Sequence, residues 1–292
     1  MKNKNGYPFV SAFIAMAASI IILLPIRVYQ YFKILESDTG FYTKTDFSVY
    51  VMYIVMAFIA IFSVAAAFAN KKSFKNKNIS FSPVSGAVVF AVAAIGFIAD
   101  AVNCFSNYSS IGLTYQNNID KTKWQFISEN GGVIILIEAV AGIISAIYFF
   151  ALSAGYISKK NTAPKLRIMA LALPIWSVAR LLIRFKTKIS FINVSDLFIG
   201  LFAIAFTMLF FLYFAQTISE VDNGETYFKM YAYGVPAAVF SLTCFVPRFL
   251  LSVIGREDLL CVGYGVELCD LLIPVMIIST LIAHSYESKK TA

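Results

Sequence analysis

The chain has 292 residues, of which 59% are hydrophobic and only 14% are charged, and its mean hydropathy is +0.76. Soluble proteins carry about 25% charged residues, so the composition excludes an ordinary soluble protein. The formal net charge is +8, but no stretch has the character of a basic soluble domain that could hold nucleic acid. We therefore expect the lipid bilayer to be the main partner, with lysines facing anionic headgroups.

Apolar segments long enough to cross a bilayer follow one another along the whole chain. A spanning helix needs about 20 mostly apolar residues, and only helices and closed barrels satisfy their backbone polar groups in lipid. None of the segments shows the short alternation of a membrane barrel strand. The sequence therefore predicts an all-α fold, a polytopic membrane helical bundle that forms one transmembrane domain over residues 1–292. Its eight transmembrane helices are expected at residues 9–32, 47–69, 83–104, 132–157, 166–184, 194–218, 231–254 and 261–284.

The basic residues of the connections indicate the orientation of the chain. The first apolar segment is too long for the apolar region of a signal peptide and ends without a cleavage pattern, so we expect it to be retained. Cytoplasmic connections carry an excess of lysine and arginine, which places both termini in the cytoplasm and the chain in an inner or plasma membrane. The residues that support this orientation are Lys2, Lys4, Lys71, Lys72, Lys75, Lys77, Lys159, Lys160, Lys165, Arg167, Lys289 and Lys290. Two connections deviate, because "RFKTKIS" is basic on the outer side and "SEVDNGETYFK" is acidic on the inner side.

Charged residues recur at similar places in the predicted helices. One lies near the outer end of each odd-numbered helix, and these four are 73, 80 and 68 positions apart: Arg27, Asp100, Arg180 and Arg248. An acid also lies near the start of each even-numbered helix, and these are Asp46, Glu138, Asp196 and Asp270. Because internal repeats recur in transporter folds, we interpret the chain as four repeated helix hairpins at about 8–70, 83–157, 165–218 and 230–285.

Two main interpretations of these charges are open, beside a third in which they face a partner protein. In the first, the arginines extend to lipid headgroups and the acids cap helix starts, so the pattern only anchors helix ends. In the second, Arg27, Arg180 and Arg248 surround one outward-opening cavity, with Asp100 as their counter-ion. Ionisable residues in membrane segments tend to face the bundle interior or a water-filled cavity, and three guanidiniums would bind an anion through paired hydrogen bonds.

The acids of the last predicted helix, at 261–284, raise a separate question. Glu267 and Asp270 are three residues apart, and Pro274 removes the helical hydrogen bond to the Asp270 carbonyl. Two carboxylates beside a free carbonyl could bind a cation or carry a proton; alternatively, the helix begins only after Gly265 and both acids lie in its first turn near water.

Asp100 and Glu138 fall in one hairpin and would repel each other unless one is protonated or an arginine lies between them.

Several kinds of site are excluded or lack support. The only histidine is His284, which excludes metal sites built on paired histidines, and neither a GxxxxGK[ST] loop nor a GxSxG turn occurs. We therefore expect no cofactor and no metal.

Cys104 and Cys261 could form a disulfide at the outer face, or pack as small apolar residues. The connection at about 105–130, which contains Trp124, is expected to cover the outer mouth or dock a partner.

The favoured function is a permease-like carrier or binding protein for a small solute, which is anionic if the arginines converge. Its candidate binding residues are Arg27, Asp100, Arg180, Arg248, Glu267 and Asp270. The alternative is a non-transporting scaffold or sensor that acts through a partner membrane protein or a second copy of the chain. An intramembrane enzyme is a weaker interpretation, because no nucleophile is matched to Glu267 and Asp270.

Overall fold

The computed structural model describes residues 8–74, 81–115, 122–159, 162–186, 194–219, 226–260 and 266–290, which are almost entirely helical. Some residues of the sequence predictions lie outside these ranges: Lys2, Lys4, Lys75, Lys77, Lys160 and Cys261. The described ranges also exclude the side chains from His284 onward, so Lys289 and Lys290 add nothing on orientation. The disulfide considered for Cys104 and Cys261 is untested, because Cys261 lies outside the described ranges.

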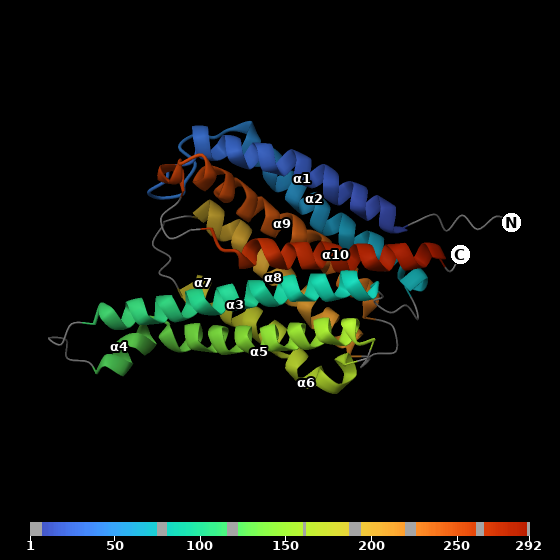
Figure 1. The fold of residues 1–292 in the computed structure, drawn as a ribbon. Coiled ribbons are helices and arrows are strands. Elements are labelled where there is room, and N and C mark those ends of the chain that lie inside the picture. The colour runs from blue at the N-terminus through green and yellow to red at the C-terminus, as the bar shows by residue number, and fades with distance from the viewer. Residues whose placement is uncertain are drawn as a thin grey trace.

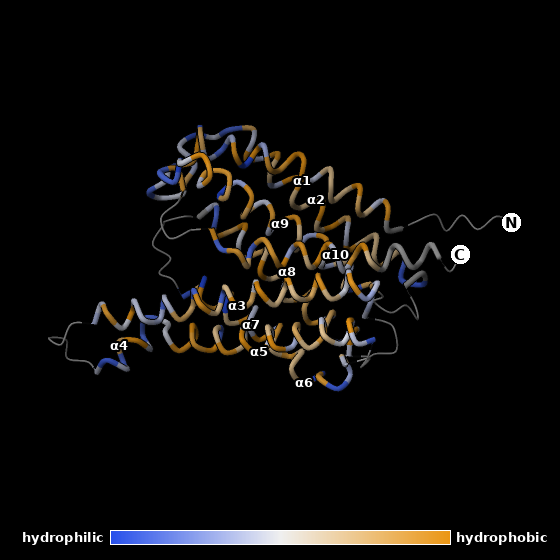
Figure 2. Tube along the Cα trace, viewed as in Figure 1, coloured by the Kyte–Doolittle hydropathy of each residue, from blue (hydrophilic) through white to orange (hydrophobic). Residues whose placement is uncertain are grey.

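Seven helical segments are long and apolar enough to cross a membrane, which makes the chain a multi-pass membrane protein. The helices that form them are α1 (Pro8–Lys33), α2 (Phe47–Ala69), α3 (Pro83–Leu113), α5 (Gly132–Ile157), α7 (Ala172–Lys186), α8 (Val194–Ile218) and α9 (Tyr227–Val253). The eighth predicted span begins later than expected, because α10 (Cys269–Lys290) starts at Cys269 and its apolar part is short. Seven of the eight predicted spans are therefore supported. Figure 2 shows apolar residues along the helices and hydrophilic residues at many of the turns between them.

Two further elements differ from the sequence prediction. The helix expected at 166–184 is broken: a short 3-10 turn (Ala163–Leu166) and α6 (Arg167–Ala170) precede α7. Pro174 accounts for the break, since a proline ring clashes with the carbonyl four residues earlier, here that of Ala170. The connection at 105–130 is partly helical, because α3 continues to Leu113 and α4 occupies Lys123–Glu129. Thr122 and Gln125 form a capping box at the start of α4.

Six helices form a closed ring in the order α3, α5, α7, α8, α9 and α10, with α10 packed against α3. The pair α1 and α2 packs against the outer side of α9 (Figure 1). The α9 helix therefore has neighbours on nearly every side, and it is the most deeply buried of the spans. The start of α1 and the end of α10 lie at one end of the bundle, which we call the terminal end, and α4 lies at the other, the α4 end (Figure 1).

Aromatic side chains fill the middle of this ring. We call them the aromatic layer: Phe90, Phe97, Phe149, Trp176, Phe211 and Phe214, all buried. Ring centroids are 4.8 Å apart between Phe97 and Trp176, 5.6 Å between Phe97 and Phe149, and 6.2 Å between Trp176 and Phe211. Aromatic pairs at such separations add to the stability gained from burial. The layer thus closes the ring between its two ends.

Candidate functional site

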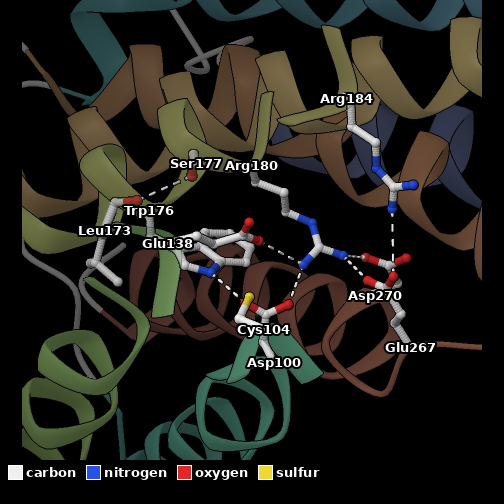
Figure 3. A network of polar contacts seen from close by, with 10 residues as sticks. All are labelled: Asp100, Cys104, Glu138, Leu173, Trp176, Ser177, Arg180, Arg184, Glu267 and Asp270. Carbon is white, nitrogen blue, oxygen red and sulfur yellow. Dashed lines mark hydrogen bonds and ion pairs between the residues drawn. The ribbon is translucent and has the colours of Figure 1, made fainter. Parts of the chain in front are cut away.

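Arg180 lies inside the ring, about one helical turn from the aromatic layer toward the α4 end. Its Nη1 contacts Asp100 on α3 and lies 3.4 Å from Oε1 of Glu138 on α5. Its Nη2 contacts Glu267 and lies 2.8 Å from Oδ1 of Asp270 on α10. One guanidinium therefore joins acids from three other parts of the ring (Figure 3). With Arg184, whose Nη2 is 3.6 Å from Glu267, we call these six residues the Arg180 cluster.

The aromatic layer fixes the orientation of this cluster. The indole Nε1 of Trp176 donates a hydrogen bond of 2.7 Å to Oδ2 of Asp100. The Arg180 guanidinium carbon is 5.3 Å from the centre of the Trp176 ring, within the range of a cation–π contact. Because Trp176 is itself packed against Phe97 and Phe211, the layer holds both Asp100 and Arg180 in place.

The Arg180 cluster carries more negative than positive charge. Its four carboxylates and two guanidiniums sum to −2 when all are ionised. An uncompensated charge away from water is costly, so the cluster favours the arrival of positive charge. Ligand atoms of Asp100, Glu138 and the thiol of Cys104 lie within 4.8 Å of one another. A metal ion there would meet the guanidinium of Arg180, which already contacts both carboxylates.

A second buried group lies between α1, α8 and α9. Arg27 donates to Oδ1 of Asp196 at 2.7 Å, and Nη2 of Arg248 is 3.3 Å from the same oxygen. The Tyr31 hydroxyl is 2.9 Å from both carboxylate oxygens of Asp196. Arg27 also donates to Oε1 of Gln30 at 2.8 Å. We call Arg27, Tyr31, Asp196 and Arg248 the Asp196 cluster; its two guanidiniums and one carboxylate sum to +1.

Both sequence interpretations of the arginines need correction. Arg27, Arg180 and Arg248 are only 1%, 5% and 3% exposed, so they do not extend to headgroups. Each pairs with an acid from another predicted hairpin. Asp100 is not their common counter-ion, because it pairs with Arg180 while Asp196 pairs with the other two. Of the two conditions left open for Asp100 and Glu138, the structure shows the arginine: Arg180 contacts both acids.

The acids before and in α10 follow the second of the two expectations only in part, since just one of them lies in the first turn of the helix. The helix begins at Cys269, so Glu267 precedes it and Asp270 lies in its first turn. Their side chains are 30% and 25% exposed, yet both contact the buried Arg180. They therefore close the Arg180 cluster on its more open side.

Sequence reasoning missed several members of the two clusters. Asp196 was grouped with Asp46 as a helix-start acid, but only Asp46 caps a helix, accepting a hydrogen bond of 2.8 Å from the Ser48 amide. Trp176 and Arg184 lie four residues before and after Arg180, so they share its helix face. That spacing could have identified both. No comparable signal in the sequence pairs Asp196 with Arg27.

A narrow cavity lies between the two clusters. Its charged lining residues are Arg180 and Arg184 on α7, Arg248 on α9 and Asp270 on α10. The other lining residues are Trp176, Gly200, Ala203, Ile204, Thr207, Ser241, Cys244, Cys269, Ile273 and Pro274. The centre of a water-sized sphere can occupy about 40 Å³ of it, which is room for a few water molecules or a small solute. Trp176 of the aromatic layer belongs to its wall. Of the six residues predicted to bind a solute, Arg180, Arg248 and Asp270 line this cavity. Asp100 and Glu267 contact Arg180, which lines it, whereas Arg27 is connected to the lining residue Arg248 only through Asp196.

The lining determines what the cavity can bind. Guanidiniums and a carboxylate offer ion pairs, Thr207 and Ser241 offer hydroxyl groups, and the alanine and isoleucine side chains offer an apolar wall. Such a mixture suits a small charged solute with a short apolar part. No protein-family model matches the chain, and no curated protein or solved structure shows significant similarity to it.

Proposed function

We propose that the chain is a permease-like carrier or binding protein for a small solute that has an anionic group. The observation that supports this best is that three guanidiniums, those of Arg180, Arg184 and Arg248, line one cavity inside the bundle. Arginine recognises carboxylates and phosphates through paired, charge-assisted hydrogen bonds. Charges kept inside a membrane bundle are costly, and they commonly mark solute pathways.

The arginines differ in how easily they can contact a solute. Arg180 is 5% exposed and contacts four carboxylates, so we assign it the role of holding the site together. The side chain of Arg184 is 21% exposed, and its pair with Glu267 spans 3.6 Å. Arg184 is therefore more accessible than Arg180, and we assign it the contact with the anionic group of the solute.

Transport requires access from both sides of the membrane. In this proposal α10 is the eighth span, the helices form the four hairpins α1–α2, α3–α5, α7–α8 and α9–α10, and both termini are cytoplasmic. The α4 end then faces outward, and the cavity opens to that side. The aromatic layer forms the inner barrier, and its parting would release the solute to the cytoplasm, as in alternating access.

Replacing Arg184 with glutamine tests this function. We expect the Arg184→Gln protein to fold normally and to bind small carboxylates about tenfold or more weakly, because one charge-assisted hydrogen bond contributes about 1.5–3 kcal/mol. The measurement is equilibrium binding of acetate, propionate, lactate and succinate to the purified, lipid-reconstituted full chain. Arg256→Gln is the matched control, since Arg256 is exposed and pairs with Asp258 outside the cavity. Unchanged affinity in Arg184→Gln, or no binding by the wild type, would contradict the proposal.

A further inference from the structure

Charged side chains of both signs line the cavity. Asp270 belongs to the Arg180 cluster, whose formal charge is −2. Arg248 belongs to the Asp196 cluster, whose formal charge is +1. The Arg180 cluster stays negative even when one of its carboxyl groups carries a proton. A solute in the cavity therefore meets one carboxylate, that of Asp270, and the guanidiniums of Arg180, Arg184 and Arg248, with the further carboxylates of the Arg180 cluster behind them.

We infer that the solute is a small zwitterion, with an ammonium group facing Asp270 and a carboxylate facing Arg184 and Arg248. This inference rests on the proposed function and specifies the solute class. It adds a second charged group, the ammonium, that the three arginines alone do not call for.

Electrostatics favours a zwitterion over an ion of either sign. A simple anion would gain from the guanidiniums but would bring further negative charge close to Asp270 and to the other carboxylates of the Arg180 cluster. A simple cation would gain from Asp270 but would be repelled by Arg248. Both repulsions are strong where water is scarce. A zwitterion satisfies lining charges of both signs and adds no net charge to the membrane interior, which is where net charge is most costly.

The size and lining of the cavity limit the rest of the solute. Along α8 the lining residues run from Gly200 to Thr207, seven positions and about 10 Å. Ala203, Ile204 and Ile273 give this stretch apolar walls. The cavity therefore suits an ammonium and a carboxylate on adjacent carbons or on one carbon, with at most a short apolar substituent.

The test uses two sets of compounds that differ only in their charged groups. The first set is glycine, acetate and methylamine, and the second is alanine, propionate and ethylamine. Each is added to the purified, lipid-reconstituted full chain, and its equilibrium dissociation constant is measured. We expect glycine or alanine to bind at least about tenfold more tightly than its anionic and cationic counterparts, since each of these lacks one charge-assisted contact.

Asp270→Asn separates this inference from the proposed function. We expect this variant to bind the amino acid about tenfold more weakly while its affinity for the anion does not fall, because only the ammonium faces Asp270. Asp258→Asn, which changes an exposed acid paired with Arg256, should affect neither. If acetate or propionate binds as tightly as the amino acid in the wild type, the zwitterion inference is overturned and the anion site stands. If the amine binds most tightly, or none of the six compounds binds, both are overturned.

Discussion

Arg180→Gln is expected to remove most of the stability of the protein. The guanidinium of Arg180 contacts four carboxylates, which belong to α3, to α5, to α10 and to the residue Glu267 just before α10. Removing one partner of a buried ion pair costs about 3–5 kcal/mol, because the other partner is left uncompensated. Proteins have only about 5–15 kcal/mol in total. We therefore expect a large fall in the melting temperature and little folded protein after size-exclusion chromatography in detergent.

Two comparisons make this result specific to the Arg180 cluster. Arg256→Gln removes an exposed arginine at the same end of the bundle and should leave the melting temperature unchanged. Adding Asp100→Asn and Glu138→Gln to Arg180→Gln removes two of the carboxylates that lost their partner, and it should recover part of the stability. If Arg180→Gln melts at the wild-type temperature, Arg180 does not hold the ring together.

Asp196→Asn is expected to lower the stability by a similar amount, because it removes a buried acid and leaves buried arginines without their counter-ion. Asp196 is 1% exposed and accepts contacts from Arg27 and Arg248, so its neutralisation leaves two buried guanidiniums beside each other. Like charges in a medium of low polarity repel strongly, and the loss of a buried partner again costs about 3–5 kcal/mol. The measurement is the melting temperature of the purified protein, followed by light scattering for aggregation.

Asp46→Asn is the matched control for Asp196→Asn. The sequence places both acids near the start of an even-numbered helix, but Asp46 caps α2 from a more exposed position. The side chain of Ser48 beside the carboxyl and the hydrogen bond from the Ser48 amide hold the pKa of Asp46 below its usual value. Asparagine caps helices as well as aspartate does, so Asp46→Asn should melt close to the wild type. Equal losses in the two variants would contradict the distinction between a cap and a buried counter-ion.

The sequence was sufficient to predict most of the helices and the all-α class of the fold. Seven of the eight predicted segments coincide with helices that are long and apolar enough to span a membrane, because length and hydropathy alone decide whether a segment can cross lipid. The late start of α10 was less predictable. The residues before Cys269 include Glu267 and are as apolar as those of other spans, so hydropathy did not mark the boundary.

The pairing of charges could not be predicted in the same way. Arg27 and Asp196 are 169 residues apart, and their contact depends on how α1 packs relative to α8 through α9. The sequence also gave Asp46 and Asp196 the same position at helix starts, although only one is buried. Whether an arginine reaches headgroups or turns inward depends on the neighbouring helices, and apolar segments match one another too easily to specify their neighbours.

Filling the cavity through Gly200 would test its role most directly. Gly200 lines the cavity. A Cβ atom added at Gly200 would have no atom of another described element within 4 Å, so there is open space for a side chain. Gly200→Leu should therefore occupy the cavity without disturbing either cluster. Phe202→Leu, on the same helix at a 43% exposed position, is the control. We expect Gly200→Leu to melt at or above the wild-type temperature and to lose solute binding by about tenfold or more, the effect of losing one good contact. A Gly200→Leu protein that folds and binds solute as tightly as the wild type would show that the cavity between the two clusters is not the binding site.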